Sequence, residues 1–97
     1  MTNAALKAIL DEEGAKVRYI KTTSHSFMLN QYWHGEETIK NSDIEYLTKG
    51  NVEMIKVKRW EPSSKKFYHE YYTTETIEKI IVVDNETDVL DPYLTQL

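Results

Sequence analysis

The chain has 97 residues, of which 40% are hydrophobic and 29% are charged, with 12 basic and 16 acidic side chains and no cysteine. A chain of this length forms one domain with a modest core, and this composition excludes a disordered polymer and a disulfide scaffold. Its three glycines are too few to favour a phosphate-binding loop. We therefore expect a single domain over residues 1–97.

The sequence predicts a protein without membrane contact. No stretch approaches the roughly 18 consecutive apolar residues that a membrane-spanning helix needs. The first residues lack the positively charged start and apolar run of a signal peptide. Together with the absence of cysteine, these features favour a reducing compartment, and we expect a cytoplasmic protein.

Residues 2–13 predict a short amphipathic helix. Thr2 or Asn3 can cap its first turn, and Gly14 is well placed to end it. Three apolar residues recur at helical spacing and form one stripe: Leu6, Ile9 and Leu10. A helix this short is unstable alone in water, so we expect the stripe to dock on the rest of the domain.

Residues 15–84 predict a β-rich core. Alternating apolar and polar residues favour strands over 16–22 and 26–34, joined by a short polar turn at 23–25. The segment 42–49 fits two structures. Ser42 and Glu45 match a helical capping box, whereas a short strand explains the same residues equally well.

The segment from Asn51 to Asp84 predicts an antiparallel meander. Three β-rich runs are joined by a proline-containing turn at 62–65 and by a second polar segment at 73–76. The first run has apolar residues in two alternating phases, which indicates a bulge near Met54. After the second polar segment, Ile77 and Ile80 have helical spacing, whereas Ile81 and Val83 have strand spacing, so we expect one helical turn that leads into the last strand.

These elements predict an α+β domain that is mainly β. We expect a short N-terminal helix followed by about five or six antiparallel strands, which form a small SH3-like or Sm-like half-open barrel or a curved meander sheet. Residues 85–97 are acidic and contain a proline, so we expect them to form a loosely attached tail.

The sequence gives no pattern typical of an enzyme, and we expect no catalytic residue, cofactor or metal ion. The three histidines, His25, His34 and His69, show no ligand spacing for zinc and have no cysteine to join them. Ser24 and Ser26 flank His25 in a predicted turn that lacks a glycine-rich elbow.

Aromatic residues of the meander form the candidate binding site. On a strand, Phe67 and Tyr71 share one face, and Tyr68 and Tyr72 share the other. If the first pair faces the core, the second pair faces outward beside the basic residues of the preceding strand. The candidate binding residues are then Lys56, Lys58, Arg59, Trp60, Tyr68 and Tyr72.

Charge is unevenly distributed and leaves three functions open. Residues 51–66 hold five basic and two acidic side chains, whereas residues 67–97 hold one basic and seven acidic side chains. We expect a non-enzymatic protein-protein interaction module that contacts a protein partner or itself, with a homodimer as one case. One alternative is a small barrel that binds single-stranded nucleic acid, which the net charge of −4 disfavours. The other is an acidic, phage-type inhibitor of a nucleic-acid-binding protein.

Overall fold

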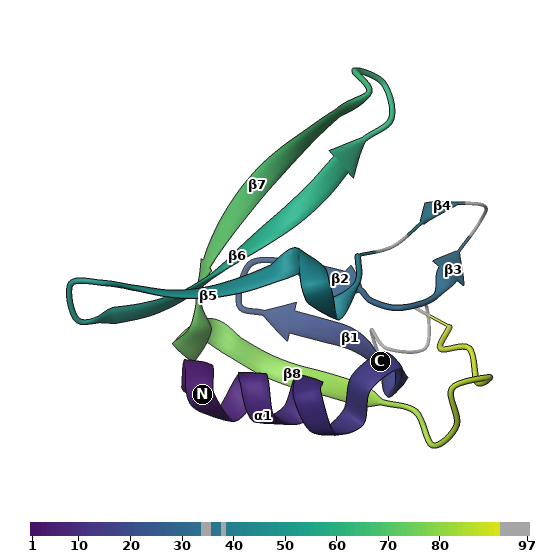
Figure 1. Cartoon of the computed structure of the whole chain (residues 1–97), viewed down its shortest axis with the longest axis horizontal. Coiled ribbons are helices and arrows are strands. Elements are labelled where there is room, and N and C mark those ends of the chain that lie inside the picture. The colour runs from purple at the N-terminus through teal and green to yellow at the C-terminus, as the bar shows by residue number, and fades with distance from the viewer. Residues whose placement is uncertain (34–35, 38, 92–97) are drawn as a thin grey trace.

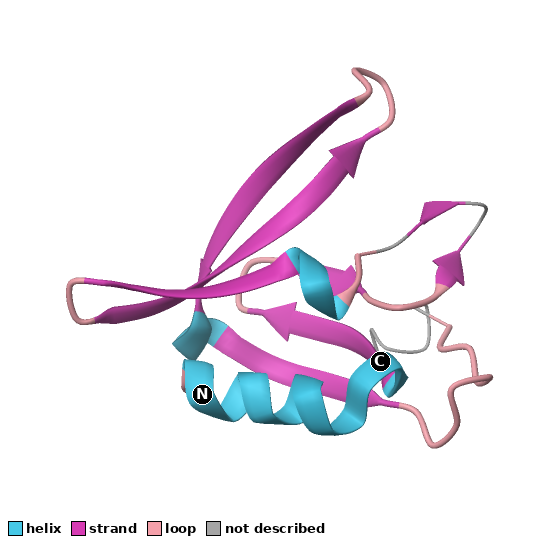
Figure 2. Cartoon of the chain, in the orientation of Figure 1, coloured by secondary structure: helices cyan, strands magenta, loops and turns pink. Residues whose placement is uncertain are grey.

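A computed structural model describes residues 1–33, 36–37 and 39–91 of the chain. Within them lie one helix, α1 (Asn3–Glu13), and eight strands. The strands are β1 (Val17–Thr22), β2 (Ser26–Met28), β3 (Tyr32–Trp33), β4 (Glu36–Glu37), β5 (Ile44–Lys49), β6 (Val52–Glu61), β7 (Lys66–Thr73) and β8 (Ile77–Val82). The chain is therefore mainly β with a short N-terminal helix, as the sequence predicted (Figure 2).

Two three-stranded antiparallel sheets make up most of the domain. The first sheet has the strand order β2-β1-β8, and the second has the order β5-β6-β7. A separate two-stranded ladder joins β3 and β4. No backbone ladder joins the two larger sheets among the described residues, so closure into an SH3-like or Sm-like barrel remains a prediction.

The predicted helix is confirmed, and its ends have clear causes. The Thr2 hydroxyl accepts a hydrogen bond from the Ala5 backbone N–H, which is the usual function of a capping threonine. Gly14 ends the helix with φ at 58°, in the region that glycine enters without steric cost. Leu6 and Leu10 are buried and fix the helix on the core.

Two strand predictions need correction, and one open alternative is decided. The expected strand over 26–34 is interrupted, because Asn30 adopts φ of 58° and its side-chain amide donates to the Val17 carbonyl. Of the segment 42–49, left open between helix and strand, residues Ile44–Lys49 form strand β5, and the segment's first two residues belong to the 3₁₀ turn Asn41–Asp43. The expected bulge near Met54 does not occur, since β6 pairs with both neighbours without a register shift.

The expected meander is also rearranged. Strands β6 and β7 pair as predicted. A helical turn precedes the last strand, but it is the 3₁₀ turn Thr74–Thr76, and Ile77 and Ile80, whose spacing predicted the turn, already belong to β8. Strand β8, however, leaves this sheet and pairs with β1. Its first residue, Ile77, is buried in the common core, and this burial favours the transfer of the strand. The meander therefore consists of β5, β6 and β7.

The core lies between the helix and the two larger sheets. Its buried members are Leu6, Leu10, Val17, Ile20, Phe27, Leu29, Ile39, Ile44, Ile55, Val57, Tyr72 and Ile77. The second sheet contributes to this core only through its first two strands and the end of β7. The rest of the hairpin β6–β7 rises away from the body of the molecule (Figure 1).

The acidic segment after β8 is attached at two places, which its composition did not predict. Arg18 is 4% exposed and donates from its guanidinium to the carbonyls of Asn30 and Glu86. The Gln31 side chain accepts from the Leu90 N–H at 3.1 Å and donates to the Leu90 carbonyl at 2.8 Å. The described part of the expected tail is therefore attached at Glu86 and Leu90, and residues 92–97 lie outside the described part of the chain.

Candidate functional site

The second sheet has one face on the core and one face directed away from it. Side chains of directly paired residues lie on the same face of an antiparallel sheet, so the register assigns every strand residue. We call the face away from the core the outer face. It comprises Glu45, Leu47, Lys49, Val52, Met54, Lys56, Lys58, Trp60, Phe67, His69, Tyr71 and Thr73.

Three aromatic side chains on the outer face are exposed to solvent. Phe67 is 59% exposed, Tyr71 is 49% and Trp60 is 48%. Trp60 and Phe67 are direct cross-strand partners, and their ring centroids lie 4.8 Å apart at an interplanar angle of 60°. Tilted contacts of this kind are favourable for aromatic rings, so the two side chains form one apolar surface near the end of the hairpin.

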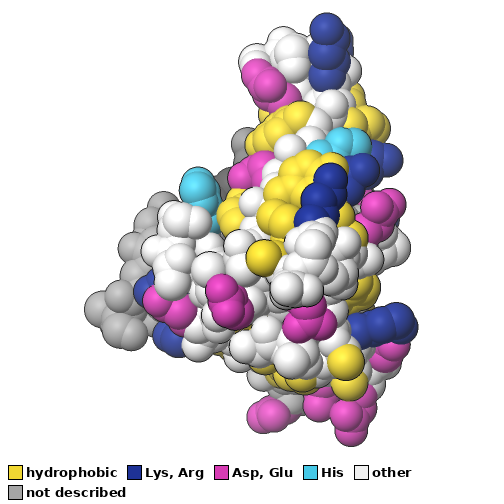
Figure 3. Space-filling model, turned by 90° about the vertical axis from the view of Figure 1, so that its left-hand side faces the viewer, with side chains coloured by type: hydrophobic (Ala, Val, Ile, Leu, Met, Phe, Trp, Pro, Cys, Tyr) yellow, Lys and Arg dark blue, Asp and Glu magenta, His cyan; other side chains and the backbone are white. Residues whose placement is uncertain are grey.

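Lysines lie among these rings. The Lys58 ammonium is 4.2 Å from the Phe67 ring centroid, and the ammonium groups of Lys49 and Lys56 are each 6.0 Å from that of Tyr71. Each distance is within reach of a cation–π interaction. Figure 3 shows this side of the molecule, with hydrophobic, Lys and His side chains gathered on the upper part.

The outer face is basic although the whole chain is acidic. Its strand residues include three lysines and a single carboxylate, Glu45, which pairs across the strands with Lys56. No ion pair to these three lysines occurs among the described residues. The ammonium groups are therefore available to an anionic group that approaches the face.

The structure places the six predicted binding residues on two faces. Lys56, Lys58 and Trp60 lie on the outer face, as expected. Tyr72 does not, because it pairs with Ile55 and is only 7% exposed. The other two, Arg59 and Tyr68, are cross-strand partners on the core-side face. The prediction of which side chains of β7 face the core was therefore wrong.

The length of the turn determines the phase of β7. Four residues, 62–65, separate β6 from β7, and the first pair after the turn is Glu61 with Lys66. Counting back from that pair places Tyr72 opposite Ile55. The sequence therefore carried the necessary signal, since a hairpin loop of known length sets the register. Alternation alone does not fix this register, and from alternation Phe67 and Tyr71 were expected to face the core.

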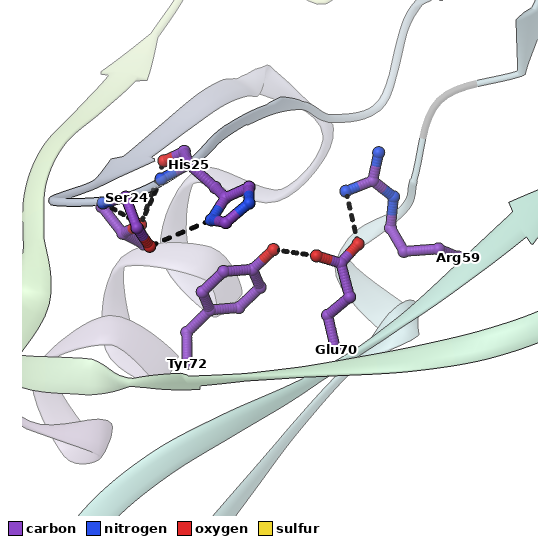
Figure 4. Close-up of polar contacts among 6 residues, drawn as sticks. Ser24, His25, Arg59, Glu70 and Tyr72 are labelled. Carbon is purple, nitrogen blue, oxygen red and sulfur yellow. Dashed lines mark hydrogen bonds and ion pairs between the residues drawn. The ribbon is translucent and has the colours of Figure 1, made fainter.

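A series of polar contacts, which we call the brace, links side chains on the core-side face of the hairpin (Figure 4). The Arg59 guanidinium donates to the Glu70 carboxylate at 3.2 Å, and the Tyr72 hydroxyl donates to the other oxygen of the same carboxylate. The Tyr72 ring meets the His25 ring edge-on, with centroids 5.7 Å apart. The contacts join β6 and β7 to the turn between β1 and β2, where the hairpin leaves the body.

Burial and this hydrogen bond change the ionisation of Tyr72. Burial, first, and the hydrogen bond to the Glu70 carboxylate, second, raise the pKa of Tyr72 well above its ordinary value of 10.0. The hydroxyl is therefore neutral at physiological pH, and it remains a donor to Glu70. We infer that this tyrosine is structural, with its polar end directed to the brace.

The only histidine beside a serine in the described residues lacks the surroundings of a nucleophilic site. His25 Nδ1 lies 3.0 Å from the Ser24 hydroxyl. The backbone N–H groups of both residues, however, donate to the Thr22 hydroxyl. These donors are therefore not free to stabilise a developing oxyanion, which argues against acyl transfer at this pair.

The described part of the chain has no metal-binding cluster, and the hollow at the base of its second sheet is smaller than a typical small-molecule site. No group of three or more His, Asp or Glu side chains is arranged to hold a metal ion there. A hollow of about 130 Å³ lies at the base of the second sheet, lined by Met1, Asn51, Val52, Glu53, Thr73 and Glu75. This volume is well below the range of several hundred Å³ that is typical of small-molecule sites.

The chain was compared with protein-family models, with curated proteins and with solved structures, and nothing matched in any of the three comparisons. Within the described residues, no helix has the length and apolar character needed to cross a membrane.

Proposed function

We propose that this protein is a non-enzymatic interaction module that contacts a partner protein through the outer face. The observation that carries the proposal is the exposure of three neighbouring aromatic side chains, Trp60, Phe67 and Tyr71. Half-exposed rings add little to folding, whereas Tyr and Trp often supply most of the binding energy at protein interfaces. Because Phe67 and Tyr71 lie on the outer face in place of Tyr68 and Tyr72, the proposed site consists of these three rings together with Lys49, Lys56 and Lys58.

The lysines of this face indicate what the partner carries. Their ammonium groups lie over the rings of Tyr71 and Phe67, so a partner that covers the rings also meets three positive charges. Acidic side chains at the rim of the partner would be steered toward this face and oriented on it. The proposed partner surface is therefore apolar at its centre and acidic at its edge.

Capture of proteins from the native host tests this proposal. The double variant Phe67→Ala/Tyr71→Ala removes two outer-face rings, and we expect the captured partner to bind at least about thirtyfold more weakly, which corresponds to roughly 2 kcal/mol. The control is Val89→Ala, which truncates a 66%-exposed apolar side chain outside the second sheet. Equal capture by both variants and the unmodified chain would contradict the proposal.

A second function, binding of single-stranded nucleic acid, is favoured by one arrangement. The rings of β7 and the lysines of β6 lie in adjacent rows on the same face, and stacking rings beside a basic track are typical of such proteins. The acidic residues responsible for the net charge of −4 lie elsewhere, apart from Glu45. The SH3-like or Sm-like barrel expected from the sequence would suit this function.

Titration with fluorescent single-stranded DNA and RNA separates the two functions. If three lysines contact phosphates, log K should fall with log salt concentration with a slope of about −2. The variant Lys56→Gln/Lys58→Gln should lower the slope, whereas Lys79→Gln, an exposed lysine on β8, should leave it unchanged. No binding at low salt would reject this second function, because the electrostatic attraction is strongest there.

A further inference from the structure

The free edge of β7 is the longest unprotected strand edge in the described part of the chain. Strand β7 is the last strand of its sheet and has eight residues. It pairs with β6 without a register shift from Met54↔Thr73 to Glu61↔Lys66, and it contains no proline. Its other edge therefore presents a row of unpaired backbone N–H and C=O groups, to which another strand can pair.

Other strand edges are shorter, covered or irregular. Strand β2 has only three residues. On β5, the Leu47 carbonyl accepts a hydrogen bond at 3.0 Å from the Asn3 side chain of α1. The β1–β8 ladder is interrupted by two register shifts. Short strands, covered backbone and bulges protect these other edges. Strand β7 has none of the three, and its only charged residues, Lys66 and Glu70, have opposite signs and can pair with each other across two copies of the strand.

We propose that β7 pairs antiparallel with β7 of a second copy of this chain, with Tyr68 of both chains at the two-fold axis. The dimer would contain one continuous six-stranded sheet, with the two outer faces on the same side. This interface uses the edge of β7 and leaves the rings of the outer face exposed. It therefore goes beyond the proposed partner site and does not depend on it.

Charge selects the register of this pairing. A two-fold axis perpendicular to the sheet pairs residues that point to the same side. With Tyr68 at the axis, Lys66 lies opposite the partner's Glu70, and this pair occurs twice. Phe67 lies opposite the partner's His69, and the two Tyr68 side chains face each other. Opposite charges and aromatic pairs are both favourable in cross-strand positions.

Neighbouring registers are less favourable. With His69 at the axis, Lys66 would lie opposite the partner's Tyr72, a buried residue that packs against Phe27 in its own core. With Glu70 at the axis, two carboxylates would lie directly opposite each other, which is destabilising. The register centred on Tyr68 avoids both conflicts, and it is the register that sets Lys66 opposite the partner's Glu70.

The position of the hairpin makes the edge of β7 accessible to a second copy of the chain. The paired residues, 66–70, belong to the half of the hairpin that rises away from the body (Figure 1). All of them except Glu70 are exposed. Because the strands run antiparallel, the two bodies would lie at opposite ends of the paired segment.

Cysteine crosslinking tests the register directly, because the chain has no cysteine of its own. Under mild oxidation, Tyr68→Cys should form an interchain disulfide at least about tenfold faster than Ser63→Cys, which places a cysteine in the exposed turn. Two residues at a two-fold axis on paired strands are close enough for this bond. Faster crosslinking of His69→Cys or Glu70→Cys than of Tyr68→Cys would overturn the register.

The mass of the unmodified chain in solution provides the second measurement. Light scattering coupled to size-exclusion chromatography should show a dimer that dissociates on dilution. Lys66→Glu changes an exposed residue and sets like charges opposite each other, so we expect roughly tenfold weaker dimerisation with an unchanged circular dichroism spectrum. A monomer at concentrations up to about 1 mM would overturn the dimer, and such a monomer could still capture a partner protein through the outer face.

Discussion

The two halves of the hairpin β6–β7 have the same alternating pattern and opposite environments. In the half near the body, Ile55, Val57 and Tyr72 point to the core side and are buried. In the far half, Arg59 and Tyr68 point to the same side, and Tyr68 is 40% exposed. Alternation decides which side chains share a face, but the rest of the chain decides how far along the strand that face is covered.

This difference separates stability from recognition along a single pair of strands. The near half contributes buried apolar area and the hydrogen bond from Tyr72 to Glu70, so it should determine most of the free energy of unfolding. The far half buries little apolar area and contributes the Trp60 and Phe67 rings, which remain in water, so it should contribute more to binding than to stability. Substitutions in the two halves should therefore have different effects, which four experiments test.

The largest effect should come from Ile55→Ala in the near half. Ile55 is fully buried between the sheets, and truncation of such a side chain lowers the free energy of unfolding by about 2–5 kcal/mol. Val52→Ala, on the outer face of the same strand, should cost about 0.5 kcal/mol or less. Urea denaturation measures both, and similar losses would show that the outer face of β6 is buried against something else.

A smaller effect is expected from Tyr72→Phe, which removes the hydroxyl of the brace. Loss of its hydrogen bond to Glu70 should lower the free energy of unfolding by about 1 kcal/mol at neutral pH. Tyr68→Phe is the control in the far half and should have almost no effect. If the hydrogen bond from Tyr72 to Glu70 does not stabilise the fold, both variants will have the same free energy of unfolding.

The Tyr72 variant should also change the response to alkali. Because the folded pKa of Tyr72 is raised above 10.0, its contribution to stability is complete below pH 10 and is lost as the pH rises above that value. Denaturation at pH 8–11 should show a smaller alkaline loss in Tyr72→Phe than in the unmodified chain. Part of the loss should remain, since burial and the nearby Asp11 carboxylate also raise the pKa of Tyr46.

The smallest effect should come from the contacts of the far half. A double-mutant cycle of Lys58→Met and Phe67→Leu isolates the cation–π contact, whose centroid distance is 4.2 Å. At an exposed position we expect a coupling free energy of about 0.5 kcal/mol. A coupling above about 2 kcal/mol would mean that this surface is shielded from water and would place the far half among the stabilising parts of the molecule.

Local features of the sequence predicted much of the fold. The helix follows from Thr2, the spacing of its leucines and Gly14, and these signals act within a few residues of one another. The turn at 23–25 and the hairpin β6–β7 are also local. In contrast, the break at Asn30 depends on contacts with Val17 and Asn41, which no nearby residue could reveal.

The candidate site was only partly predictable for the same reason. Its composition of lysine and aromatic residues was visible in the sequence, and Trp60, Lys56 and Lys58 lie where they were expected. The face of Tyr72 depended on its register with Ile55, which the turn length fixes but which simple alternation along β7 does not. The partner of β8 could not be inferred from spacing, because β1 lies about sixty residues away in the chain.

That distant pairing has a consequence for the order in which the protein folds. Strands β5, β6 and β7 follow one another directly and close short loops, whereas β1 cannot meet β8 until nearly the whole chain has been brought together. Because closure of a long loop costs more entropy than closure of a short one, we expect the hairpin β6–β7 to form early and the β1–β8 ladder to form late. The segment that offers the binding surface would then be exposed to other chains before the core is complete.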